Sequence, residues 1–233
     1  MEREKPVTGE IYHVYNRGVE KRVIFLDTGD YARFAHCLWE FNDSKPAANT
    51  ERRLPRYDKL TDKFEDRLRT SGTSGVKKRA KLVEILAWCL MPNHFHLMLR
   101  QLVDNGIPTF MRKVGTGYVN AFNLARDRVG PLFQGVYKFK HVSREEHFLY
   151  LPHYIHLNPC DLVPDTNNKE LLAFLDSYRW SSFQDYCGKK NFPSLIEQSF
   201  ISDIFKSPDI YRQEVIEWLK EGSDTEIQNI LLD

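Results

Sequence analysis

The sequence contains no long apolar run, few cysteines and almost no net charge. No apolar stretch approaches the roughly 20 residues that a membrane-spanning helix needs, and the first residues lack the apolar segment of a signal peptide. The four cysteines are scattered and never form Cys-x-x-Cys. We therefore expect a cytoplasmic protein with no membrane contact, no disulfide framework and no zinc knuckle.

The composition is that of a folded protein with an uneven charge distribution. With 42% hydrophobic residues in a chain of 233, the protein can bury one large core. The net charge of +1 conceals two opposite segments. Residues 51–81 hold eleven Lys or Arg against five Asp or Glu, whereas residues 188–233 hold five against nine. The basic segment is either a polyanion-binding element or a solvated insertion.

Apolar periodicity predicts alternating strands and helices, followed by a helical extension after Pro193. Gly115 and Gly117 weaken the second predicted helix. Pro152 predicts a kink or a new start in the third, which must stop near Pro159. The order of elements indicates an antiparallel α+β sandwich. The predicted strands are 10–16, 85–90, 94–100 and 133–142, and the predicted helices are 30–41, 107–124 and a third that begins with a capping box at 143–146.

The tripeptide His94-Phe95-His96 is the most informative motif. Residues i and i+2 of a strand point to the same face, so both imidazoles project side by side. Two neutral imidazoles on one strand form half of a divalent-metal site. The alternative is a pair of ordinary polar residues on a sheet face.

A second pair of polar residues occurs on the third predicted helix. Tyr154 and Asn158 are four residues apart and therefore share one helix face. The Asn158 carbonyl oxygen is a suitable ligand for Mg²⁺ or Mn²⁺, although an Asn before Pro is also common where a helix stops. The Tyr154 phenol, with an ordinary pKa near 10, is protonated at neutral pH and needs activation to act as a nucleophile. Tyr150, one turn earlier, is the rival nucleophile, and a packing role fits it better.

These motifs, together with others in the same order along the chain, resemble the IS200-like single-tyrosine transposases. The REP-associated tyrosine transposases are the most similar group. The resemblance runs from about Gly9 to Tyr186. It rests on the segments Tyr12-His13-Val14-Tyr15-Asn16-Arg17-Gly18, Met91-Pro92-Asn93-His94-Phe95-His96-Leu97-Met98-Leu99, Gly130-Pro131-Leu132-Phe133-Gln134-Gly135, Tyr154-Ile155-His156-Leu157-Asn158-Pro159 and Tyr178-Arg179-Trp180-Ser181-Ser182-Phe183.

The resemblance implies a ferredoxin-like domain of the His-hydrophobic-His (HUH) endonuclease class. It implies that His94 and His96 bind a divalent metal and that Asn158 is the third ligand. Tyr154 would attack a single-stranded DNA phosphodiester, leaving a 5′-phosphotyrosine link. The domain would span residues 1–187 with a basic insertion at about 44–81, and residues 188–233 would form an acidic helical extension. One departure is Cys160-Asp161-Leu162-Val163, where the family has a Val-Arg-Ala-Gly-like stretch.

Other polar residues have weaker assignments. We interpret His13 as a sheet histidine that is satisfied within the fold, although it could reach the active face. His153 and His156 are predicted to meet solvent or DNA. Residues 133–140 interleave aromatics with lysines, which suits single-stranded DNA or a sheet core. The candidate DNA-binding residues are Arg17, Arg112, Lys113, Arg126, Arg128, Lys138 and Lys140.

The sequence therefore predicts a metal-dependent transposase that cleaves and rejoins single-stranded DNA at hairpin-forming repeats. One alternative is a non-catalytic regulator that binds repeat DNA on the same fold. Another is a phosphodiesterase that uses water as the nucleophile. The long basic insertion at about 44–81, called the excursion below, and the C-terminal extension favour a monomer over a homodimer. A DNA partner would make the protein nucleoid-associated within the cytoplasm.

Overall fold

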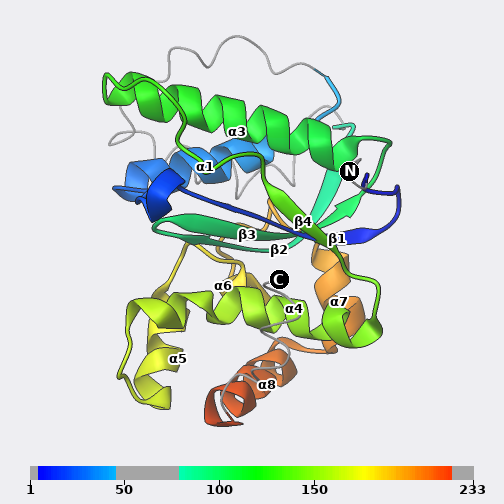
Figure 1. Ribbon diagram of the computed structural model, residues 1–233. Helices are drawn as coiled ribbons and strands as arrows, with labels where there is room; N and C mark the ends of the chain where they lie inside the picture. The colour runs from blue at the N-terminus through cyan, green and yellow to red at the C-terminus, as the bar shows by residue number, and fades with distance from the viewer. Residues whose placement is uncertain (1–4, 46–78, 222–233) are drawn as a thin grey trace.

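One four-stranded antiparallel sheet forms the centre of the molecule (Figure 1). The computed structural model describes residues 5–45 and 79–221. The strands follow the order β2-β3-β1-β4 across the sheet. With one helix after β1 and one after β3, the chain has the βαββαβ order of a ferredoxin-like fold, which confirms the α+β prediction. The strands are β1 (Ile11–Arg17), β2 (Val83–Met91), β3 (His94–Gln101) and β4 (Lys138–His141).

Helices α1 (Thr28–Glu40) and α3 (Gly106–Ala125) cover one face of the sheet (Figure 1). Asp27 caps α1, because its side chain accepts a hydrogen bond from the Asp30 amide. Helix α3 forms although Gly117 was expected to weaken it. Gly117 faces Phe41, the residue at the C-terminal end of α1. A Cβ at this position would lie 2.3 Å from the Phe41 ring, so a larger residue would require that ring to move.

Helix α4 (Glu145–Leu157) packs against the opposite face, and the C-terminal helices lie around it (Figure 1). The 3₁₀ helix η4 (Asn158–Leu162) continues α4 directly. A second 3₁₀ turn, η1 (Val19–Lys21), follows β1. In residues 5–45 and 79–221 no helix is long and apolar enough to span a bilayer. The remaining helices are α5 (Asn168–Ser177), α6 (Phe183–Tyr186), α7 (Gln198–Phe205) and α8 (Pro208–Glu221).

Three local predictions need correction. Of the strand predicted over 133–142, only β4 (Lys138–His141) forms as a strand; before it, the Gln134 amide donates to the Arg17 carbonyl, and the Gly135 carbonyl accepts from the Asn16 side chain. The predicted capping box is also wrong. Arg144 is the N-cap, with an extended backbone and no side-chain cap bond, so α4 begins one residue later than a Ser143 cap requires. Pro152 neither ends nor restarts α4, which continues through it to Leu157.

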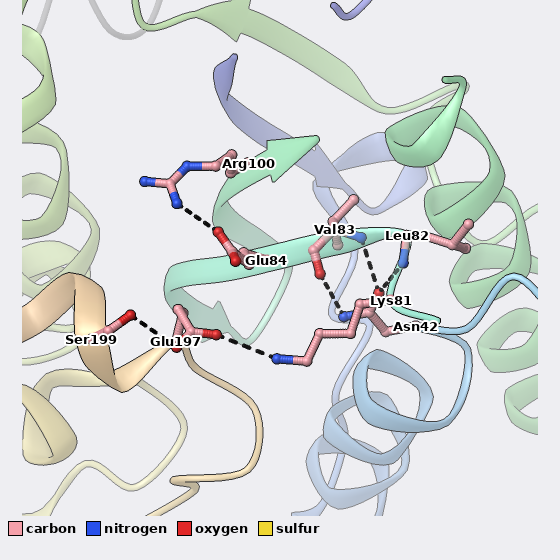
Figure 2. Close-up of polar contacts among 8 residues, drawn as sticks. All are labelled: Asn42, Lys81, Leu82, Val83, Glu84, Arg100, Glu197 and Ser199. Carbon is pink, nitrogen blue, oxygen red and sulfur yellow. Dashed lines mark hydrogen bonds and ion pairs between the residues drawn. The ribbon is translucent and has the colours of Figure 1, made fainter. Parts of the chain in front are cut away.

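Asn42 closes the base of the predicted excursion, most of which lies outside the described residues (Figure 2). Its Oδ1 accepts from the amides of Leu82 and Val83 at 3.0 and 3.1 Å, and its Nδ2 donates to the Val83 carbonyl at 2.9 Å. The Ser44 amide also donates to the Ala80 carbonyl at 2.9 Å. The chain therefore leaves and re-enters the fold at neighbouring points.

The first residues of β2 are also anchored to later parts of the chain (Figure 2). Glu84 forms an ion pair with Arg100 of β3 at 2.7 Å. Lys81 contacts Glu197, just before α7, at 3.4 Å, and Glu197 accepts from the Ser199 hydroxyl. The segment that leads out of the excursion is thus held by both the sheet and the C-terminal helices.

Candidate active site

The two histidines of the tripeptide, His94 and His96, lie on the sheet face that packs against α4, as strand alternation predicts. Phe95 points to the opposite face, into the core under α1. The register of β1 against β3 pairs Arg17 with His94 and Tyr15 with His96. Directly opposed residues of antiparallel strands project from the same face, so the end of β1 contributes to the same surface.

The hydrogen bonds of His94 present one ring nitrogen as an acceptor. Its Nδ1 lies 2.6 Å from Asn93 Oδ1, and the Asn93 amide group is oriented by its own donation to the Lys21 carbonyl. Burial lowers the pKa of His94, so the ring is neutral at physiological pH and has a single N–H. With that proton on Nδ1, the lone pair of Nε2 faces Asn158 Oδ1 at 3.5 Å.

His96 is buried and has a histidine neighbour from the first strand. Its Nδ1 lies 2.9 Å from Nε2 of His13, and the two rings stack at 5.1 Å. Burial lowers the pKa of His96 well below its ordinary value, and the nearby His13 and His94 rings lower it further. His13 is therefore a buried histidine on the sheet, and it lies on the active face in direct contact with a predicted metal ligand.

Helix α4 brings Tyr154 to these histidines. The Tyr154 ring meets His96 edge-on at 5.5 Å and His13 at 5.8 Å. Asn158, one turn later, donates from Nδ2 to the Tyr154 carbonyl at 2.8 Å, which leaves its Oδ1 directed at His94. Burial raises the pKa of Tyr154 to about 12, an effect that the Asn158 side chain partly opposes. Tyr154 is therefore protonated at neutral pH.

The rival nucleophile Tyr150 has a different environment. Its ring packs against Trp218 of α8 at 4.9 Å, and it does not line the pocket that holds Tyr154. The structure thus places it as the packing aromatic that we expected.

A pocket of about 900 Å³ opens over Tyr154, His94, His96 and Asn158. Among the described residues, its charged lining consists of the cations Arg17, Lys21 and Lys138 and the carboxylate Asp161. The concave, largely positive site suits a phosphodiester. The remaining lining residues are Tyr15, Asn16, Asn93, Phe95, Gln134, Gly135, Val136, Leu157, Cys160, Trp218 and Leu219.

The predicted DNA-binding residues fall into two groups. Arg17 and Lys138 line the pocket, and Lys140 pairs with His13 across β1 and β4, on the same face. The four basic residues on or just after α3 belong to the layer on the other side of the sheet and do not line the pocket. These four are Arg112, Lys113, Arg126 and Arg128.

Within the described part of the chain, three of the four α3-side cations have structural partners. Arg126 contacts Asp30 at 2.6 Å and Asp27 at 3.5 Å. Lys113 donates to backbone carbonyls at the base of the excursion, and Arg128 donates to Asn123 and to the Pro131 carbonyl. The DNA-binding role of all four residues stays a prediction. For Arg126, Lys113 and Arg128 the structure shows contacts that hold parts of the fold together.

The prediction that His153 and His156 face solvent or DNA is wrong. Both are buried under the C-terminal helices. His156 contacts the Tyr211 hydroxyl at 2.5 Å and Ser182 Oγ at 2.6 Å. His153 stacks on Trp218 at 5.1 Å. Helix α8, which the sequence did not place, covers this side of α4.

Several pocket residues were missed from the sequence. Lys21 lies in a 3₁₀ turn after β1, and Trp218 and Leu219 come from α8, far along the chain. Asp161 was noted only as a departure from the family. No local pattern marks these residues, although Lys21 lies only three residues after the end of the first motif. In the described ranges no three His, Cys, Asp or Glu side chains gather as a metal site, so any such site must include another donor.

Comparison with known proteins supports the fold. No family model and no curated protein matches the chain. A solved structure of a REP-associated tyrosine transposase bound to a REP hairpin is similar, with a TM-score of 0.52 and 14% sequence identity. The match covers 84% of this chain and 90% of that chain. This likeness confirms that the chain has the fold that the motif resemblance implied.

Proposed function

We propose that this protein is a metal-dependent transposase-type enzyme that cleaves and rejoins single-stranded DNA through a covalent link to Tyr154. The observation that carries the proposal is the edge-on approach of the Tyr154 ring to His96 at 5.5 Å, in a pocket that also holds His94 and Asn158. The fold shared with a transposase solved on a REP hairpin supports hairpin-forming repeats as the DNA.

The reaction needs one nucleophile and no external energy source. The Tyr154 oxygen attacks the phosphorus of a phosphodiester as the bond from phosphorus to the 3′ oxygen breaks. The phenol loses its proton, the departing 3′ oxygen gains one, and the 5′ phosphate remains esterified to Tyr154. Since the ester conserves the bond energy, a 3′-hydroxyl can attack the phosphotyrosine and rejoin a strand without ATP.

The residues present fit a divalent cation such as Mg²⁺ or Mn²⁺. Nε2 of His94 and Oδ1 of Asn158 face each other at 3.5 Å, and both are acceptors when the other atoms of the two groups make their observed hydrogen bonds. Two facing lone pairs repel unless a cation or a proton lies between them. His94, His96 and Asn158 would hold the ion, which would supply Lewis-acid polarisation of the scissile phosphate.

The cations around the pocket would hold the DNA backbone. Arg17 is exposed and is oriented by a hydrogen bond from Nε to Gln134 Oε1 at 2.7 Å. Lys138 and Lys21 are exposed and line the same pocket. These side chains lie around the phenol and can contact phosphates that flank the scissile one.

The deciding experiment uses a library of single strands with a short hairpin between randomised flanks, labelled at the 3′ end. A 5′-phosphotyrosine link leaves that label on the protein, so denaturing electrophoresis with Mg²⁺ or Mn²⁺ is expected to show a labelled adduct. Tyr154→Phe should abolish the adduct, and the matched variant Tyr150→Phe should retain it. Adding a strand with a 3′-hydroxyl should release the label into a longer DNA.

Three results would contradict the proposal in different ways. Binding without an adduct would indicate a non-catalytic regulator. Cleavage without an adduct, unchanged by Tyr154→Phe, would indicate a phosphodiesterase that uses water. An adduct that persists in EDTA would remove the metal requirement.

A further inference from the structure

His13 is a buried residue for which the proposed reaction has no direct use. It lies on β1 and has no exposed surface. Its Nε2 is 2.9 Å from Nδ1 of His96, its ring is tilted against that of Tyr15 at 4.9 Å, and the Tyr154 ring meets it edge-on at 5.8 Å. This packing restricts rotation of the ring, so the contact with His96 has a fixed direction.

The hydrogen bond between the His13 and His96 rings contains one proton, and the nitrogen that carries this proton determines whether His96 can bind a metal. If His13 Nε2 donates, His96 accepts at Nδ1 and must carry its own proton on Nε2. That nitrogen then has no lone pair for a metal. If His96 Nδ1 donates, His13 Nε2 accepts and Nε2 of His96 is free to ligate. Only the second arrangement is compatible with His96 as a ligand.

We infer that His13 is a positioning residue that holds His96 in the tautomer protonated at Nδ1 and thereby presents its Nε2 to a divalent cation. The inference rests on the metal requirement of the proposed function. In the same way, Asn93 Oδ1 holds His94 in the tautomer protonated at Nδ1 when it accepts a hydrogen bond from that nitrogen, at 2.6 Å. Each predicted histidine ligand thus has its own acceptor, and loss of such an outer partner typically weakens metal affinity 10–100-fold.

Two variants separate hydrogen bonding from packing. His13→Gln places an amide oxygen near the position of Nε2 and can still accept from His96. His13→Leu fills a similar volume with no acceptor. Binding of Mn²⁺ in the absence of DNA, followed by electron paramagnetic resonance, is expected to weaken about 10–100-fold in His13→Leu and only a few-fold in His13→Gln. Equal affinity of His13→Leu and the wild type would overturn the inference.

A second measurement needs no variant of His13. Long-range ¹H–¹⁵N correlation spectra of the metal-free wild-type protein report which ring nitrogen of each histidine is protonated, and His96→Ala assigns the His96 signals. The expected tautomer of His96 has its proton on Nδ1. A proton on Nε2 in the metal-free protein would overturn the inference, even if His13→Leu failed to fold.

These tests are independent of the DNA reaction. Mn²⁺ binding that depends on His13 without any DNA adduct would leave the inference standing and refute the proposed function. A normal adduct with Mn²⁺ affinity insensitive to His13 would do the reverse.

Discussion

The two faces of the sheet carry opposite chemistry although the same strands form both. Towards α1 and α3, residues such as Val14, Phe95 and Leu97 are fully or almost fully buried in an apolar core. Towards α4, alternate residues of the same strands include His13 and His96, which are equally buried but hydrogen-bonded to each other. The apolar face stabilises the fold and leaves the other face free to hold polar groups at fixed positions.

The basic residues show the same division. On the α3 side, Arg126 is engaged with Asp30 in a largely buried ion pair. On the α4 side, Arg17 and Lys138 are exposed at the pocket. Positive charge in the sequence therefore occurs in two settings, ion-paired beside α3 and exposed at the pocket, and its position relative to the sheet separates them. The predictions below test this division in order of decreasing effect.

Substitutions at adjacent residues of β3 should affect different properties, because the two side chains point to opposite faces of the sheet. We expect His94→Ala to reduce DNA cleavage at least about 100-fold with little change in stability, because it removes a predicted ligand from a partly exposed position. Phe95→Ala should lower the free energy of unfolding by about 3–5 kcal/mol, because it leaves a cavity in the core. Urea denaturation and the adduct assay measure the two effects. A stability loss of similar size in both variants would show that the faces are not separable.

Replacement of two arginines should likewise have different effects, on stability in one case and on DNA binding in the other. Arg126→Ala is expected to cost about 1–3 kcal/mol of stability, because it leaves the buried Asp30 carboxylate without its cation. Arg17→Ala should leave stability unchanged, weaken single-stranded DNA binding and reduce its salt dependence by about one ion. Fluorescence anisotropy at several salt concentrations measures the binding. A larger loss of DNA affinity in Arg126→Ala than in Arg17→Ala would contradict this division and indicate that DNA contacts the α3 side of the sheet.

Tyrosines on the two faces should titrate differently. Burial raises the pKa of Tyr118, in the core, far above its ordinary value, whereas the pKa of Tyr154 rises only to about 12. Below that value the phenolate fraction of Tyr154 increases tenfold per pH unit. The cleavage rate should therefore rise from neutral to mildly alkaline pH without a plateau. A plateau near pH 7 would show that another group lowers the pKa of Tyr154.

The smallest effect is expected at the base of the excursion. Replacing residues 46–78 with a short Gly-Ser linker should change stability by less than about 1 kcal/mol, because Ser44 and Ala80 are already hydrogen-bonded. The control, Asn42→Ala, should cost about 2–3 kcal/mol because it leaves buried backbone groups without partners. Thermal unfolding compares the two. Comparison of DNA affinity with and without the excursion tests whether its positive charge contributes to binding.

Local periodicity was sufficient to predict most elements and the two halves of the site. Strand alternation placed His94 and His96 on one face, and helical spacing placed Tyr154 and Asn158 on another. It failed at the start of α4 and at the first half of the strand predicted over 133–142, where the Asn16 side chain donates to the Gly135 carbonyl. It also failed for His153 and His156, since burial by α8 leaves no local signal.

The sequence alone therefore determined which side chains share a face, because that depends only on the repeat of one strand or one helix. The tertiary structure decided which faces meet. Register between β1 and β3 places His13 against His96 across 83 residues of sequence, and packing of α4 and α8 onto the sheet completes the pocket with Tyr154 and Trp218. Such contacts depend on the summed packing of the whole core, which no single motif encodes.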